Sequence, residues 1–221
     1  MLDKARLIAL LVAVAVVAAH IAETLSTERL FTRSDGDMRS YARLLQQDGD
    51  QRQPACLTSS GAEEPSLAVL MRAIMTVGTH ASSGLERLVE ATAIRGAVLL
   101  GMPVPDFSLG LGQIRPSTAI KALRSVGPPG TGTAPPPPQV ALRLLQPCDS
   151  LRIGIAVLAW ISRRNGLDHR ELTKHEIFAI AGRYNTDGGG DGLEGALAVR
   201  LYQMLVFHTY QELRFRALSS G

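Results

Sequence analysis

The sequence predicts a mostly α-helical domain preceded by an apolar helix at the N-terminus. After residue 65, apolar residues recur three and four positions apart through most of the chain, which is typical of helices packed on one core. Strand-like alternation is scarce, and short runs rich in Pro and Gly separate the periodic segments. With 221 residues and 46% hydrophobic content, the chain can bury one core of ordinary size.

The N-terminal apolar segment has the pattern of an export signal. Lys4 and Arg6 precede an unbroken apolar run over residues 7–19, and His20 is the first polar interruption. As a helix, residues 7–22 would measure about 24 Å, against about 30 Å for the hydrocarbon core of a bilayer. This length favours a cleaved signal peptide over a permanent membrane anchor or a buried core helix. Residues 1–22 are therefore assigned as a signal peptide or an anchor, and both options export the rest of the chain.

Export determines how the two cysteines are interpreted. Outside the cytoplasm thiols tend to oxidise, and a single pair usually bonds with itself. A disulfide between Cys56 and Cys148 is therefore expected. It would close a loop of about 90 residues and add ~3 to 4 kcal/mol to the free energy of unfolding. No His lies near either cysteine in the sequence, so no metal site is predicted. No cofactor is expected.

The helical domain is predicted at residues 65–215, after a polar stalk at 23–64 that contains a short helical patch at 41–45. Helical spacing starts at Pro65 and Ser66, which suit a helix entry. One face of this first helix carries Leu67, Leu70, Met71, Ile74 and Gly78. A second helix is predicted over 84–100, and its inner side is assigned to Leu85, Leu88, Val89 and Thr92.

The remaining helices are separated by loops rich in Pro and Gly. A loop at 101–107 contains two prolines, and Ser117 is expected to cap a short helix that runs to Val126. The insertion at 127–139 is too rich in Pro and Gly for regular structure. Further helices are predicted over 150–164, 174–183 and 193–213, the last of them after a glycine loop at 186–192.

Three separated segments place polar residues beside glycines. They read Ala73-Ile-Met-Thr-Val-Gly-Thr-His80, Ser108-Leu-Gly-Leu-Gly-Gln-Ile-Arg-Pro-Ser-Thr-Ala119 and Ile180-Ala-Gly-Arg-Tyr-Asn185. In this order and approximate spacing they resemble the soluble lytic transglycosylase family. The counterparts in that family are a helix that closes with Glu-Ser, a Gly-Leu-Met-Gln-Ile-x-Pro-x-Thr-Ala stretch and an Ala-Tyr-Asn-x-Gly signature. The resemblance spans residues 66–205 and is interrupted by the proline-rich insertion.

The resemblance implies a lysozyme-like fold and a site for the glycan strands of peptidoglycan. It implies that substrate is contacted by Ser108, Gly110, Gln113, Tyr184 and Asn185. Glycine at 110 leaves room for a sugar to approach the backbone, and the Gln113 amide offers both a donor and an acceptor. Tyr184 is expected to hydrogen-bond a carboxylic acid while its ring packs, and Asn185 to hold the turn or a sugar.

The catalytic glutamate of the family is missing from its expected position, where this chain has Gly78. In the family that acid protonates the glycosidic oxygen between MurNAc and GlcNAc, and its carboxylate then helps the muramyl C6 hydroxyl close a 1,6-anhydro ring. Three alternatives follow: binding without cleavage, a displaced acid, or an acid lost by replacement. Glu90 is the preferred displaced acid, because apolar residues flank it and it lies nearer the predicted inner side. Glu86, beside an arginine, is expected to be solvated, and Asp106 is a third candidate.

Charge and composition limit the possible partners. The net charge is +3, with no long Lys/Arg run and no interleaved aromatics, so no nucleic acid is expected. The expected partners are peptidoglycan glycan strands, the inner membrane through an uncleaved N-terminal segment, and an envelope-spanning complex. The sequence thus predicts an exported, periplasmic or cell-wall-facing lytic transglycosylase-like protein. The alternative is a non-catalytic peptidoglycan-binding or scaffold subunit.

Overall fold

The computed structural model describes residues 42, 56, 66–81, 84–126, 135–167, 171–186 and 193–219. The predicted signal segment, most of the stalk and residues 127–134 lie outside this part of the chain. The helices are α4 (Ser66–Ala81), α5 (Gly84–Leu99), α6 (Pro116–Val126), α7 (Pro137–Leu144), α8 (Pro147–Arg164), α9 (Lys174–Thr186) and α10 (Leu193–Ser219). Among the described residues the only extended pairing is an isolated bridge between Leu109 and Ile114. The predicted mostly helical class is confirmed, although α10 extends beyond the expected domain end at 215.

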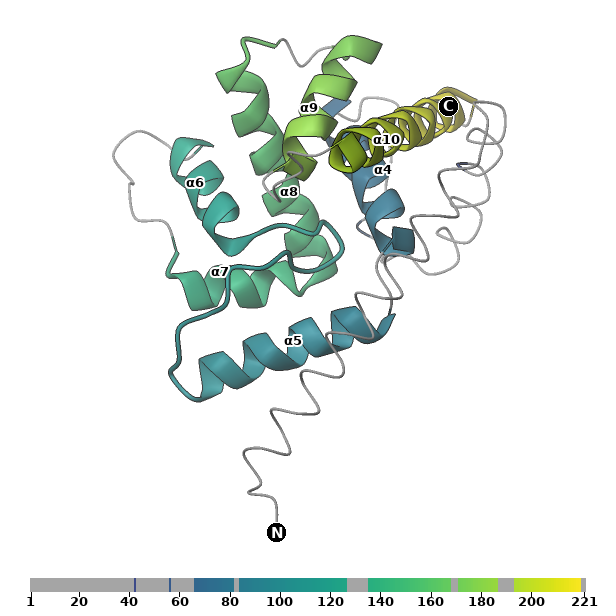
Figure 1. The fold of residues 1–221 in the computed structure, drawn as a ribbon. Coiled ribbons are helices and arrows are strands. Elements are labelled where there is room, and N and C mark those ends of the chain that lie inside the picture. The colour runs from purple at the N-terminus through teal and green to yellow at the C-terminus, as the bar shows by residue number, and fades with distance from the viewer. Residues whose placement is uncertain are drawn as a thin grey trace.

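Helix α4 lies at the centre of the domain. Every side chain from Ser66 to Val77 is buried, as expected of a helix that is surrounded by protein on all sides. α4 packs against α8 and α10, α9 packs against both of these helices, and α6 and α7 pack against α8. α5 contacts α7 and lies across the bottom of the view in Figure 1.

The close packing of α4 on α8 depends on a glycine. Met71 of α4 is fully buried, and a Cβ atom added at Gly154 of α8 would lie 2.5 Å from its Sδ. With any other residue at 154 the Met71 side chain would have to move, so glycine allows the observed close packing. A Cβ at Gly112 would likewise lie 2.9 Å from Met71 Cε. The Met71 side chain therefore lies against both α8 and the turn that contains Gly112.

Helix α9 begins at Lys174 because of a capping box. The Glu176 carboxylate accepts hydrogen bonds from the Thr173 N–H and hydroxyl, both at 2.7 Å. The Thr173 hydroxyl oxygen in turn accepts from the Glu176 N–H at 3.3 Å. These bonds satisfy donors that a helix start otherwise leaves without partners. The predicted start at 174 agrees with the structure, while the helix continues past 183 to Thr186.

Helix α7 lies within and after the segment that was expected to be irregular up to 139. Pro137 and Pro138 occupy its first turn, where N–H groups have no acceptor within the helix. Their missing N–H groups therefore cost little at this position. Val140, Ala141 and Leu144 are buried and bind the helix to the core. The prediction of no regular structure through 139 is wrong from Pro137 onward.

The inward face of α5 also differs from the prediction. Leu88, expected inside, is 63% exposed, and Thr92 is exposed as well. Ile94 and Ala97 are buried instead, at 0% and 4% exposure. Residues that are four positions apart lie on the same face of a helix. Glu90 lies four positions before Ile94 and therefore belongs to the inward face as well.

The predicted disulfide between Cys56 and Cys148 is confirmed, with Cα atoms 5.8 Å apart. Cys148 lies in the first turn of α8. Ala42, also from the predicted stalk, is fully buried in the core. Two residues of the predicted stalk are thus attached to the helical domain.

No single described helix has the length and apolar composition required to cross a membrane, whereas α7 and α8 meet that requirement only as a pair bent by 113°.

Candidate functional site

The site predicted from the sequence centres on a tight turn between α5 and α6. The N–H groups of Leu109 and Ile114 each donate to the carbonyl of the other at 3.1 Å, and these two bonds close the turn. Gly110 has φ of +66°, a left-handed conformation that favours glycine. A Cβ atom at Gly110 would also collide with the carbonyl oxygen of Leu144 at the end of α7. The glycine is therefore required both by its backbone conformation and by the close approach of α7.

Gln113 adopts a left-handed backbone conformation without being glycine. Its φ is +51°, and its Nε2 donates to the Gly110 carbonyl at 3.0 Å. The backbone N–H of Gln113 donates to the same carbonyl at 3.2 Å. Non-glycine residues in this conformation are uncommon and cluster at ligand and active sites. One amide donor of Gln113 is used within the turn, and its Oε1 makes no hydrogen bond with the described residues.

Gly112 is held by side chains from two other helices. Its N–H donates to Ser150 Oγ of α8 at 3.4 Å. Its carbonyl accepts from the hydroxyl of Tyr184, in α9, at 2.5 Å. Burial raises the pKa of Tyr184 well above its ordinary value, and the neighbouring Tyr202 raises it further. The phenol therefore stays protonated and remains a hydrogen-bond donor through the whole neutral range.

Gly78 lies against the same turn. A Cβ atom at this position would be 3.4 Å from the Leu111 carbonyl oxygen and 3.8 Å from Gln113 Cγ, which are ordinary contact distances. The end of α4, the glycine turn and Tyr184 of α9 thus meet in space, although they are far apart in the sequence. The three segments that suggested the family are brought together around Gly112.

Glu90, the preferred displaced acid, lies on α5, and a neighbouring arginine of that helix contacts the end of α4. Arg87, three residues earlier, donates from Nη1 to the carbonyl of Thr79 at 2.9 Å, directly after Gly78. This bond attaches the inward face of α5 to the end of α4. Glu90 follows on that face before the buried Ile94, and its Oε2 is buried.

The other two acid candidates differ in position. Asp106 is exposed, and its two carboxylate oxygens accept from the Ser117 N–H at 2.8 Å and from the Ser117 hydroxyl at 2.6 Å. Asp106 thereby caps α6, the role that was expected of Ser117. The side chain of Glu86 lies outside the described residues.

The remaining predicted site residues contribute less. Ser108 is half-buried directly before the turn. The side chain of Asn185 lies outside the described residues. The expected bond from Tyr184 to a carboxylic acid is absent from the described part of the chain, where its hydroxyl donates to the Gly112 carbonyl instead.

Two residues of the arrangement were missed from the sequence. Ser150 was noted only as the start of a helix, and Arg87 only as a neighbour of Glu86. No sequence pattern around either residue indicates its role, because each forms a hydrogen bond with a residue of another element. The described residues contain no group of three or more His, Cys, Asp and Glu side chains suited to a metal ion.

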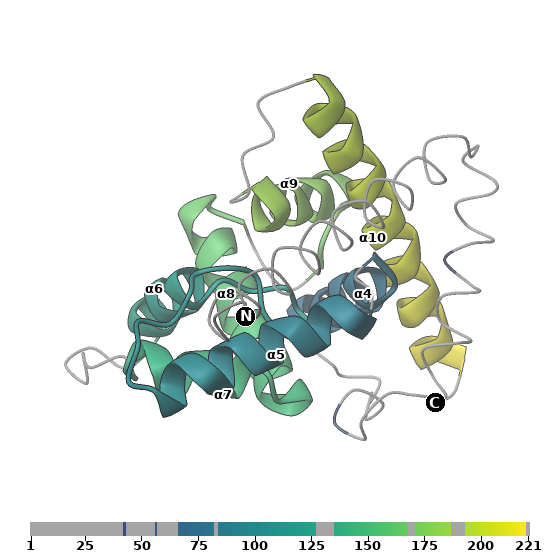
Figure 2. The same cartoon turned by 60° about the horizontal axis from the view of Figure 1, so that its bottom comes forward.

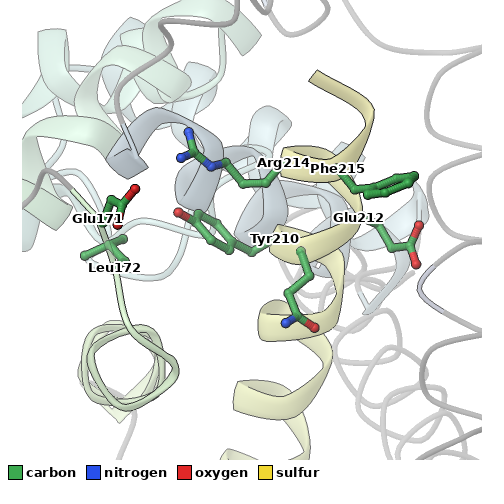
Figure 3. A pocket seen from close by; sticks show the side chains of 7 residues that line it. Glu171, Leu172, Tyr210, Glu212, Arg214 and Phe215 are labelled. Atoms are coloured by element: carbon green, nitrogen blue, oxygen red, sulfur yellow. The ribbon is translucent and has the colours of Figure 1, made fainter. Parts of the chain in front are cut away.

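An open pocket of about 730 Å³ lies elsewhere, between α10 and the segment before α9. Figure 3 shows Tyr210 and Arg214 projecting from α10 on the side of Glu171 and Leu172. Its lining includes none of the residues around Gly112.

Comparison of the chain with protein-family models, with curated proteins and with solved structures gives no match.

Proposed function

We propose that residues 66–219 form a lysozyme-like domain that engages the MurNAc–GlcNAc strands of peptidoglycan as a lytic transglycosylase. The observation that carries this proposal is the meeting of three segments at Gly112. The Tyr184 hydroxyl holds the Gly112 carbonyl, and Gly78 lies against the neighbouring Leu111 carbonyl. These are the segments whose order and composition resemble the family, and a glycan site requires all three on one surface.

The glycine turn supplies groups suited to a sugar. Gly110 and Gly112 carry no side chains, and the Gln113 Oε1 is available as an acceptor for a sugar hydroxyl or an N-acetyl N–H. Tyr184, Ser150 and the Leu109–Ile114 bridge hold the turn rigid. A rigid turn reduces the ordering cost of binding a flexible glycan.

The proposed acid is Glu90. It donates a proton to the glycosidic oxygen as the bond from that oxygen to the MurNAc C1 breaks. The C6 hydroxyl oxygen then bonds to C1, and its proton returns to the Glu90 carboxylate, which gives the 1,6-anhydro product. The reaction requires a carboxyl group that is shielded from water. The buried Oε2 of Glu90 suits this role better than the exposed Asp106.

A second function is favoured by Gly78 itself. The position where the family has its acid carries no side chain, while the turn opposite it is intact. A domain that retains this surface without an acid would bind glycan and serve as a scaffold subunit of an envelope complex. In both cases the protein is exported and faces the cell wall, which the disulfide supports, because disulfides persist outside the cytoplasm.

Digestion of purified peptidoglycan by the full chain tests the proposal, with 1,6-anhydromuropeptides measured by mass spectrometry. The parent chain is expected to release them, and Glu90→Gln to lower the rate by roughly 10² to 10⁴-fold, as for loss of a general acid. Glu86→Gln, one helical turn away, is the matched control and is expected to keep the activity.

The variant Gly78→Glu separates the two functions. A Cβ at this position meets only ordinary contacts, so a side chain can leave the backbone here without a clash at its first atom. Release of product by Gly78→Glu alone would favour the scaffold and contradict Glu90 as the acid. A parent chain that neither cleaves nor binds peptidoglycan would overturn both functions.

A further inference from the structure

Five consecutive exposed residues form the corner that follows α5. Residues 99–103 read Leu-Leu-Gly-Met-Pro, and all five are exposed. Leu99 is 86% exposed, Leu100 69% and Met102 51%. Soluble proteins commonly expose single apolar side chains, but a contiguous group marks an interaction surface. We refer to residues 99–103 as the apolar corner.

The backbone of the apolar corner needs no external hydrogen-bond partner for its N–H groups. The Leu100 N–H donates to Gly96 O at 3.0 Å, the Gly101 N–H to Val98 O at 3.2 Å and the Met102 N–H to Ala97 O at 2.9 Å. Gly101 has φ of +64°, so the helix ends in a Schellman motif. Pro103 has no N–H group. The corner can therefore enter an apolar medium without leaving these donors unsatisfied, which is the main cost of placing backbone in lipid.

The charged residue that precedes the apolar corner on α5 is basic. After the corner the first charged residue is Asp106, whose carboxylate accepts hydrogen bonds from Ser117 at the start of α6. Arg95, one helical turn before Leu99, is exposed and forms no ion pair with the described residues. An apolar corner flanked by arginine fits a bilayer that carries anionic headgroups.

The position of the apolar corner permits such an approach. Figures 1 and 2 both show the far end of α5 at the edge of the molecule, away from α10. A projecting corner can enter a lipid surface without displacing other elements. The apolar run over residues 7–19 independently predicts that the chain passes through or begins at a membrane.

We propose that the apolar corner Leu99–Pro103 inserts into the surface of an anionic lipid bilayer, with Arg95 at the headgroups. This docking would hold the domain against the membrane in a fixed orientation. It is independent of the glycan site, because it uses none of the residues around Gly112.

Tryptophan fluorescence of the full chain reconstituted in vesicles tests this insertion. Trp160 is the only tryptophan, so Leu100→Trp in a Trp160→Phe background reports on the corner alone. In vesicles containing phosphatidylglycerol, the emission is expected to shift to shorter wavelength and to be quenched by brominated acyl chains. Gln211→Trp in the same background, at an exposed position on α10, is the matched control and is expected to stay unquenched.

Two further comparisons establish whether the apolar corner binds an anionic lipid bilayer. Arg95→Gln is expected to lower the ratio of inserted to free corner roughly fivefold in anionic vesicles and little in zwitterionic ones. Equal emission and equal quenching of the Leu100→Trp and Gln211→Trp variants in every vesicle would overturn the proposal. A blue shift without vesicles that grows with protein concentration would also overturn it, since a second copy of the chain would then cover the corner.

Discussion

The hydroxyl of Tyr184 donates a hydrogen bond to the carbonyl oxygen of Gly112 at 2.5 Å, across 72 residues of sequence. This bond joins α9 to the glycine turn. The same peptide segment is held from α8, where Ser150 accepts from the Gly112 N–H. The turn is thus fixed by helices that follow it in the sequence, and its shape depends on the complete domain.

Replacement of Tyr184 by Phe removes the hydroxyl and leaves the ring. The Gly112 carbonyl then loses its donor, so the free energy of unfolding is expected to fall by about 1 to 2 kcal/mol. Urea denaturation measures the change, and hydrogen exchange of residues 109–114 should become faster. Tyr210→Phe is the matched control, because Tyr210 is also a largely buried residue, but its hydroxyl makes no hydrogen bond with the described residues. Equal stability of the two variants would show that the bond to Gly112 contributes nothing.

Alkaline pH should unfold the domain through its buried tyrosines. Burial raises the pKa values of Tyr184 and Tyr202 in the folded protein above the ordinary value of 10.0. Below pH 10 both phenols are protonated in both states, so their contribution to stability is constant. Above pH 10 the unfolded chain loses these protons first, and stability should fall by about 1.4 kcal/mol per pH unit for each tyrosine. In Tyr184→Phe the free energy of unfolding should fall less steeply with pH, by the contribution of one tyrosine. An unchanged dependence on pH would contradict the raised pKa of Tyr184.

Glycine is required at position 110 both by the left-handed backbone and by the contact with α7. A pair of variants distinguishes these two causes. Gly110→Ala forces alanine into a left-handed conformation and drives its Cβ into the Leu144 carbonyl. We expect a loss of about 2 to 4 kcal/mol in the free energy of unfolding. Gly166→Ala has nearly the same φ, at +64°, and meets nothing within 4 Å, so only about 1 to 2 kcal/mol should be lost. Equal losses would show that contact with α7 is unimportant.

The disulfide should stabilise both the domain and the glycine turn. Cys148 lies between Leu144 and Ser150, the two residues of α7 and α8 that contact the turn at Gly110 and Gly112. The double variant Cys56→Ser, Cys148→Ser is expected to lose about 3 to 4 kcal/mol. Hydrogen exchange at residues 109–114 should rise more than exchange in α10. Uniform acceleration across the domain would show that the disulfide has no particular effect on the turn.

Much of the helical architecture is predictable from the spacing of apolar residues. Helices α4, α5, α9 and α10 begin within one residue of their predicted starts, because polar or glycine-rich segments interrupt the apolar spacing before them. The sequence does not predict α7, because a run of prolines usually breaks a helix, although proline is well suited to a first turn. The predicted inward face of α5 is also wrong, because the apolar Leu88 is exposed. Contacts with other helices, such as the bond from Arg87 to Thr79, orient α5 instead.

The candidate site was predictable as a set of residues and not as a set of contacts. Gln113 and Tyr184 stand out through the resemblance of their motifs to a known family. Their actual bonds, to Gly110 and Gly112, depend on how α8 and α9 pack, which no local pattern reports. Glu90 stands out through its apolar neighbours, whereas the burial of its Oε2 depends on how α5 packs in the domain.

The central claim is that the end of α4, the glycine turn and Tyr184 form one saccharide-binding surface. Hydrogen exchange of the full chain with and without a soluble MurNAc–GlcNAc oligosaccharide tests it most directly, whether or not the strand is cleaved. We expect protection of residues 76–81 and 109–114 together, and loss of that protection in Gln113→Ala. Protection confined to the pocket between α10 and Glu171, or no protection anywhere, would contradict it.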